Sequence, residues 1–265
     1  MLAALLMANL FDGWSELTAS TGSDAAPLRL GTLSQDRVYQ TFSRYRRLFL
    51  WGCFCGAFLV KTPLYPFHLW LFRAHVVSPI AGSVLLAGIV LKLASYGVVV
   101  VLLGKFLDAT VSGQGFVIAL AVLSLVASSL SVLRQADIKA VIALSSVGHM
   151  AVVTLGLVSL SSVAFDGAII LSLAHGFVSP VLFVIVGGVL YDRLHTRTIR
   201  YLRGLSLLMP VMAVVFFLAS LANMATPPFM NWAREFLVIA RLFDGHAIAG
   251  FLASTSVILG ASYSI

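Results

Sequence analysis

The sequence predicts an all-α polytopic membrane protein in which prolines interrupt two of the helices and the two halves of the bundle form an inverted repeat. Of its 265 residues, 60% are hydrophobic and only 10% are charged, and the mean hydropathy is +1.02. A soluble domain has roughly 25% charged residues. We therefore expect a single transmembrane domain over residues 1–265, with about seven full spans of roughly 20 residues each.

Apolar runs separated by polar segments give the order of the expected spans. A partial helix at about 1–11 precedes a polar loop at about 12–47. The N-terminal run lacks the basic start of a signal peptide and the arginines of a transit peptide, so we interpret it as a truncated transmembrane helix. The expected spans are 48–70, 79–104, 115–133, 138–160, 167–191, 205–240 (interrupted) and 247–265.

Basic residues between the apolar runs predict the orientation of the chain. A net charge of +7 is also typical of nucleic-acid-binding proteins, but these arginines cluster in short loops, as membrane orientation signals do. We therefore expect no nucleic-acid partner. The short loops on the side where span 48–70 ends are the most basic, which marks that side as cytoplasm-like or matrix-like. Their basic residues are Arg73, Arg134, Lys139, Arg193, Arg197, Arg200 and Arg203.

Prolines interrupt two of the expected spans. Pro63 and Pro66 lie in the first full span, and Pro227 and Pro228 lie in span 205–240. Proline removes a backbone donor and clashes with the preceding turn of a helix. A broken helix at membrane depth persists only where it packs in protein or lines a cavity, and paired broken helices are typical of inverted-repeat transporters.

Short matches around the two breaks support an internal repeat. Thr62 precedes the first proline as Thr226 precedes the third, and Ala-Ser-Tyr occurs at 94–96 and again at 261–263. The spacing between the members of each match is nearly the same. An odd number of expected crossings separates the two broken spans, so the repeat is predicted to be inverted.

Six ionisable side chains fall inside or beside the apolar runs, and we take them as the candidate site residues. Burying a charge at the bilayer centre costs about 3 kcal/mol on insertion scales, so such residues usually have a function. Histidine titrates near neutral pH, and a desolvated lysine loses its proton more easily. The group therefore predicts a chain of titratable sites that moves protons. Its members are Lys61, His68, Lys92, His149, His175 and Glu235.

Several of these residues also have a purely structural interpretation. Lys61 could extend its ammonium toward a membrane surface if it lay near a helix end. His149 and His175 could each join two helices through a backbone carbonyl. Glu235 could form a local ion pair with the adjacent Arg234.

No motif predicts a cofactor or a metal in this chain. The sequence has no Walker loop and no GxGxxG after a strand pattern, and its cysteines and histidines lack the spacing of a zinc site. Cys53 and Cys55 lie inside an apolar run, where we interpret them as small hydrophobic side chains.

Four segments bring most of these residues together in a recognisable order. They are KTPLYPFHLWLFRAHVVSPIAGSVLLAGIVLKLASYG (61–97), RQADIKAVIALSSVGHM (134–150), LAHGFVSPVLF (173–183) and LANMATPPFMNWAREF (221–236). Over about residues 48–265 the chain resembles the subunit 4 family of NADH:ubiquinone oxidoreductase, respiratory complex I. That family shares its fold with subunits of multisubunit Na⁺/H⁺ antiporters.

The resemblance implies an antiporter-like, proton-translocating subunit of the complex I membrane arm. Lys61 corresponds to the lysine before the break of family helix 7, Lys92 to that of helix 8, and Glu235 to the carboxylate after the break of helix 12. The corresponding intramembrane histidines are His68, His149 and His175. The resemblance also implies lipids and other membrane-arm subunits as partners, with the redox chemistry in those subunits. It favours the mitochondrial inner membrane over a bacterial plasma membrane.

The chain departs from the family pattern in composition and in length. The family usually has other residues at the positions of Phe72, Arg73 and Val77. It also usually has a neutral residue before the glutamate, where this chain has Arg234. The match starts near family helix 6 and stops within helix 13. We therefore expect either a piece of a split subunit or part of a longer product, with a separate polypeptide supplying the missing helices and a carboxylate partner for Lys61.

Three functions remain open from the sequence. The first is a complex I subunit, and the second is a subunit of a multisubunit Na⁺/H⁺ antiporter without a redox partner. The third is a structural membrane fragment that no longer pumps.

Overall fold

A computed structural model of the chain describes residues 44–202, 204–227 and 229–264. Within these ranges the chain is helical and forms no strand, so the predicted all-α class is confirmed. An isolated β-bridge between Asp137 and Thr198 joins two loops. The helix expected at about 1–11, most of the polar loop 12–47, Arg203 and Pro228 lie outside the described residues.

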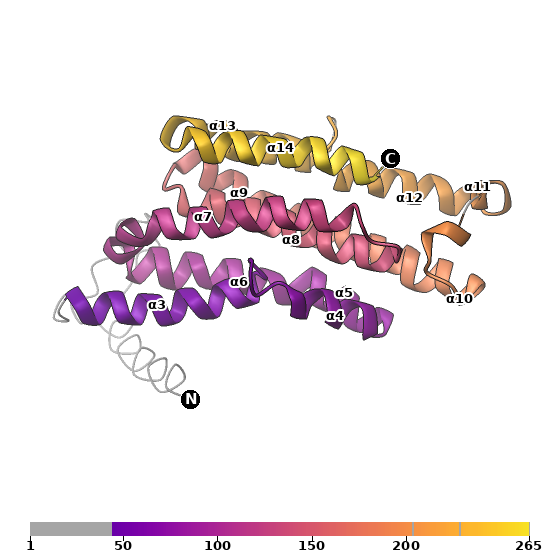
Figure 1. Cartoon of the computed structure of the whole chain (residues 1–265), viewed down its shortest axis with the longest axis horizontal. Coiled ribbons are helices and arrows are strands. Elements are labelled where there is room, and N and C mark those ends of the chain that lie inside the picture. Colours follow the sequence, from indigo (N-terminus) through magenta and orange to yellow (C-terminus); the bar gives the residue numbers. More distant parts are fainter. Residues whose placement is uncertain (1–43, 203, 228, 265) are drawn as a thin grey trace, which may run out of the picture.

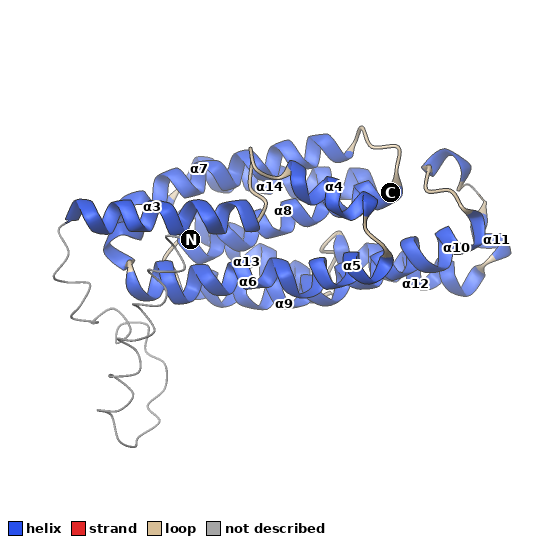
Figure 2. Ribbon diagram, turned by 90° about the horizontal axis from the view of Figure 1, so that it is seen from below, coloured by secondary structure: helices blue, strands red, loops and turns tan. Residues whose placement is uncertain are grey.

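The helices lie roughly along one another in rows (Figure 1). Helices α13 and α14 form one edge, α7, α8 and α9 form the middle, and α3 to α6 form the other edge. The same helices seen from below remain aligned along the long axis (Figure 2). The bounds are α3 (Arg44–Lys61), α4 (Leu69–Val77), α5 (Ile80–Leu85), η2 (Leu86–Val90), α6 (Leu91–Gly97), η3 (Val98–Leu103), α7 (Leu107–Val132), α8 (Ile138–Val158), α9 (Ser162–Val184), η4 (Ile185–Leu190), α10 (Tyr191–Leu194), η5 (Ile199–Tyr201), α11 (Leu205–Leu208), α12 (Pro210–Asn223), α13 (Met230–Gly245) and α14 (Ala247–Ser264).

Four continuous helices among the described residues are long and apolar enough to cross a membrane: Ile80–Leu103, Leu107–Val132, Ile138–Val158 and Ser162–Leu194. The first of them contains the π-helical turns η2 and η3, and the last continues through η4 and α10. Two shorter apolar helices correspond to α12 and α14. Helix α8 lies in the centre of the bundle, and almost all of its side chains are buried.

Helix α7 begins well before residue 115, where the sequence pattern placed its start. The extra turns contain polar residues, which weakened the hydrophobic signal. Thr110 makes these turns acceptable in a buried position, because its hydroxyl donates to the carbonyl of Leu102 and accepts from the indole of Trp51, each at 2.9 Å. A polar residue whose hydrogen bonds are satisfied costs little to bury.

The first break separates α3 from α4 directly after Lys61, where the prolines predicted it. Carbonyl groups released at a helix end need new donors, because lipid offers none. The indole Nε1 of Trp70 donates to the carbonyl of Val60 at 2.9 Å. The Thr62 hydroxyl donates to the carbonyl of Phe58 at 2.8 Å. Side chains of the break itself therefore replace part of the lost helical bonding.

The second break separates α12 from α13 and uses the same devices. The amide of Asn231 donates to the carbonyl of Ala222 at 2.8 Å, as Trp70 does at the first break. Thr226 donates to the carbonyl of Leu221 at 3.0 Å, in the role of Thr62. Thr62 bonds the carbonyl four residues before it and Thr226 the carbonyl five residues before it, so each threonine bonds the end of the helix that precedes its break.

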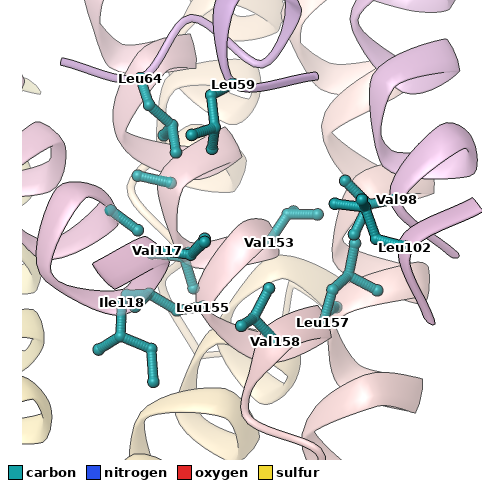
Figure 3. Close-up of a cluster of buried hydrophobic side chains, with 14 of the residues drawn as sticks. Leu59, Leu64, Val98, Leu102, Val117, Ile118, Val153, Leu155, Leu157 and Val158 are labelled. Atoms are coloured by element: carbon teal, nitrogen blue, oxygen red, sulfur yellow. The ribbon is translucent and has the colours of Figure 1, made fainter. Parts of the chain in front are cut away.

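The largest apolar cluster joins the first broken helix to α7 and α8. Figure 3 shows Leu59 and Leu64 on one side of it, Val98 and Leu102 on another, and Val153 and neighbouring α8 residues between them. Water does not drive association within a bilayer, so close packing and small residues hold such helices together.

Gly156 allows α8 to approach α9 closely. An added Cβ would lie 2.7 Å from Cβ of Ala168 and 2.9 Å from the carbonyl of Ala164. Both neighbours belong to a helix that cannot yield without disturbing the bundle. A substitution there overfills the contact.

We predict that Gly156→Ala lowers stability by about 1–3 kcal/mol, the usual effect of overpacking. The measurement is the thermal unfolding of the assembled protein. Gly115→Ala is the matched control, because it also lies inside a helix and its added Cβ would meet no atom within 4 Å. Alanine there should leave stability unchanged or raise it. Equal melting temperatures for the two variants would contradict the prediction.

Candidate functional site

Lys92 lies on α6 directly after the π-helical turn η2 and is half-buried. Its ammonium Nζ donates to the carbonyl of Ala87 at 2.7 Å and lies 2.7 Å from Nδ1 of His175 on α9. A π-turn widens the helix and often marks a functional site. Here the widened turn supplies the carbonyl that the lysine uses.

Two glycines allow η2 and α9 to come close enough for this contact. A Cβ added to Gly176 would lie 3.2 Å from Cε of Lys92 and 3.4 Å from the carbonyl of Gly88. A Cβ added to Gly88 would lie 3.3 Å from the ring of Pro180. Larger residues at either position would separate Lys92 from His175.

Glu235 on α13 pairs with His149 on the central helix α8. The distance from Oε1 of Glu235 to Nδ1 of His149 is 2.6 Å, and both residues are 8% exposed. A short contact of this kind is a charge-assisted hydrogen bond. The local ion pair with Arg234 is not observed: Glu235 bonds His149 instead, and the buried Nε of Arg234 has no partner within the described part of the chain.

The two histidines lie next to each other and leave one nitrogen each unused. Their ring centroids are 5.4 Å apart with a 50° angle between the planes. Nε2 of His149 and Nε2 of His175 are both buried and have no hydrogen-bonding partner among the described residues. The structural interpretation of either histidine as a link to a backbone carbonyl is therefore wrong, because each Nδ1 bonds an ionisable side chain.

Two hydrogen bonds and one ring contact join four side chains into a line, which we call the α6–α13 line. Its members are Lys92 of α6, His175 of α9, His149 of α8 and Glu235 of α13. Its partners assign the protons when Lys92 is an ammonium and Glu235 a carboxylate. Nδ1 of His175 then accepts from Lys92, so its proton is on Nε2. Nδ1 of His149 donates to Glu235, so its Nε2 is an acceptor. Nε2 of His175 is then a donor and Nε2 of His149 an acceptor, and neither has a partner among the described residues.

The structure does not bring Lys61 and His68 into this line. Lys61 ends α3 and is exposed on this chain, so it is not buried as the sequence suggested. The described residues give it no hydrogen bond and no ion pair. His68 is buried in the first break and stacks on Tyr65 with ring centroids 5.6 Å apart. Its Nδ1 has no partner in that part of the chain.

Sequence reasoning missed two polar groups beside the line. His75 on α4 is fully buried against the ring of Phe183, with centroids 4.5 Å apart, and neither ring nitrogen has a partner in residues 44–202, 204–227 or 229–264. Its position just after a proline break was a usable signal. Tyr263 on α14 lines a small cavity together with His149 and Glu235. Only its place in the repeated Ala-Ser-Tyr hinted at this. The described residues contain no group of three metal-binding side chains.

Comparison with known proteins shows which family the chain belongs to. A family model described as the transmembrane region of NADH:quinone oxidoreductase and Mrp antiporter proteins matches residues 10–260. The chain belongs to this family. Membership agrees with the line of lysine, histidine and glutamate and with the two broken helices.

Curated relatives within the NADH:quinone oxidoreductase/Mrp antiporter family are about twice as long as this chain. NADH-ubiquinone oxidoreductase chain 4 of Mycosarcoma maydis is 51% identical over 216 residues, which are 82% of this chain and 45% of the relative. The chain 4 protein of Arabidopsis thaliana is 44% identical over 224 residues, 84% of this chain and 45% of that protein.

Solved structures of the family share the fold. Respiratory complex I from Thermus thermophilus contains a chain that matches with a TM-score of 0.76 and 27% identity over 84% of this chain and 48% of that one. The Mrp complex from Dietzia contains a chain with a TM-score of 0.77 and 20% identity over 98% of this chain and 47% of that one. The antiporter-like bundle expected from the sequence is therefore confirmed.

We predict strong energetic coupling between His149 and Glu235. Removing one member of a buried pair typically costs about 3–5 kcal/mol, while removing both costs less than the sum. The measurement is a double-mutant cycle of His149→Leu and Glu235→Leu, followed by thermal unfolding of the assembled protein. The control cycle uses the exposed pair of Arg241 and Asp244 on the same helix, 3.1 Å apart, which should couple by less than about 1 kcal/mol. Additive effects at the buried pair would contradict the assignment.

Proposed function

We propose that this chain is the proton-conducting half of a chain-4-like subunit in the membrane arm of a respiratory NADH:quinone oxidoreductase. The observation that carries the proposal is the α6–α13 line, in which three contacts connect a lysine to a glutamate across four helices. Proton transfer requires groups within hydrogen-bond reach or joined by water. The similarity to chain 4 proteins supports the assignment to this subunit.

The assigned protons suggest how one proton crosses the line. Lys92 gives a proton to Nδ1 of His175, and His175 releases its proton from Nε2 to Nε2 of His149. His149 then gives its Nδ1 proton to Glu235, which becomes a neutral carboxyl. The two imidazoles are joined by a ring contact rather than a hydrogen bond, and their Nε2 atoms have no partner among the described residues. A small ring rotation or one bridging water would connect them.

Energy for this transfer would come from electron transfer elsewhere in the complex. We propose that this chain holds no redox cofactor and that the other membrane-arm subunits and lipids surround it. The location that fits the curated relatives is the mitochondrial inner membrane. His68 would extend the path at the first break, where it is buried beside Tyr65.

The exposed position of Lys61 supports a partner outside the described chain. An ammonium at a helix break within an apolar bundle is stabilised by a nearby carboxylate. The chain spans about half the length of the curated relatives that it matches. We propose that a carboxylate from outside this half, on a separate polypeptide, pairs with Lys61.

A subunit of a multisubunit Na⁺/H⁺ antiporter is the second candidate, because the family model includes Mrp proteins and the Dietzia complex shares the fold. Affinity purification of the chain from its native membrane separates the two. Flavin and iron–sulfur subunits in the purified complex would support the first candidate. Sodium-dependent proton exchange without those subunits would replace it with the second.

We predict that Lys92→Ala abolishes most proton pumping by this subunit, since it removes the first donor of the line. The measurement is the number of protons moved per NADH oxidised in vesicles with assembled complex. Leu93→Ala is the control, because Leu93 is the next residue on the same helix and is 50% exposed. Unchanged pumping by an assembled Lys92→Ala complex would favour a structural fragment that no longer pumps.

We predict that a zero-length carbodiimide links Lys61 covalently to a second polypeptide. The reagent forms an amide only between an amine and a carboxylate in direct contact. Lys61→Arg keeps the charge but lacks the reactive amine, so the linked product should disappear in that variant. Mass spectrometry of the linked peptides identifies the carboxylate. A wild-type complex that yields no Lys61 product would contradict the proposed pair.

A further inference from the structure

A small, partly polar cavity adjoins Glu235 and His149. Its volume is about 30 Å³, and α7, α8, α12, α13 and α14 contribute to its lining. Its polar side chains are Ser129, Ser145, His149, Asn223, Glu235, Ser256 and Tyr263. The proton path proposed along the α6–α13 line involves neither Tyr263 nor the cavity.

The volume of the cavity indicates what it can hold. A buried space needs roughly 10–15 Å³ to hold one water, and the water needs two to four polar partners. This cavity has the volume for one ordered water and little more. Its walls are polar, so it differs from the empty apolar cavities of protein interiors.

The hydrogen bonds already present leave suitable partners free. Glu235 uses Oε1 for His149, and Oε2 has no hydrogen bond among the described residues. Asn223 uses its amide nitrogen for Oγ of Ser145 at 3.3 Å, which leaves its carbonyl oxygen available. Asn223, Ser145 and Glu235 are all more than 90% buried, so they depend on each other or on a trapped water.

We propose that this cavity binds one water that bridges the carboxylate of Glu235 and the hydroxyl of Tyr263. Tyr263 is a positioning residue: it holds the water where Glu235 can release the proton that it receives. Tyr263 comes from α14, whereas the members of the α6–α13 line come from other helices. The site thereby links α14 to the end of the line. The water site stands on the cavity alone, while the proton step rests on the proposed function.

The step is a simple proton transfer. The O–H bond of the neutral Glu235 carboxyl breaks, an O–H bond forms on the water, and Glu235 returns to a carboxylate. The oxygens of Asn223 and Tyr263 stabilise the positive charge that the water acquires. Bulk water at the membrane surface then takes the excess proton.

The structural test is a map of the assembled wild-type complex at a resolution that shows ordered waters. The expected result is one water peak within about 3.2 Å of both Tyr263 Oη and the Glu235 carboxylate. An empty cavity, or a peak coordinated as a metal ion, overturns the water site. This test needs no pumping, so its outcome is independent of the proposed function.

The functional test compares Tyr263→Phe with Tyr201→Phe, whose phenol is 72% exposed. Tyr263→Phe should slow pumping about fivefold, the effect of losing one hydrogen bond at a transfer step, and shift its pH profile. Tyr201→Phe should change neither. Wild-type pumping at every pH in Tyr263→Phe, together with loss of pumping in Lys92→Ala, overturns the role of Tyr263 alone. Normal pumping in both Tyr263→Phe and Lys92→Ala overturns the proposed function instead.

Discussion

The positive charge of Lys92 at the centre of an apolar helix is the constraint on which the rest of the site depends. An ammonium there is tolerated only if neighbouring groups replace its water. The π-turn provides the carbonyl of Ala87, and the close approach at Gly88 and Gly176 provides His175. Satisfying this one charge thus fixes the geometry between η2 and α9, and His175 in turn places His149 and Glu235 in range.

The backbone of the two broken helices is under the same constraint, because polar groups at membrane depth need partners within the protein. Each break exposes carbonyl groups at a depth where lipid cannot bond them. Trp70 and Asn231, which follow the two breaks, supply the missing donors. These hydrogen bonds therefore offset part of the free-energy cost of interrupting a helix. Helix α13 begins after the second break and has Glu235 on its buried face.

Local signals in the sequence predicted the breaks and named all four members of the line, because prolines and isolated charges stand out in apolar runs, but they also named Lys61 and His68, which lie outside it. They did not predict the pairing, since Glu235 and His149 belong to helices that meet only in the folded bundle. Adjacent residues on a helix point about 100° apart, which is why Arg234 does not neutralise Glu235. The sequence placed Lys61 inside an apolar run, whereas the side chain is exposed at the end of α3. Tyr263 carried almost no signal, since a tyrosine in an apolar span is ordinary.

The adjacent imidazoles of His149 and His175, whose Nε2 atoms have no partner among the described residues, have a consequence for proton leakage. In the proposed transfer, each passage of a proton would leave both imidazoles protonated on the opposite nitrogen. The pair could not conduct a second proton until the rings turned over or exchanged their protons. An open water wire would let the membrane voltage, worth about 2.3 kcal/mol per charge at 100 mV, drive protons straight back. Under the proposed transfer, a histidine pair that must be reset after every passage would admit single protons and would keep the membrane insulated between turnovers.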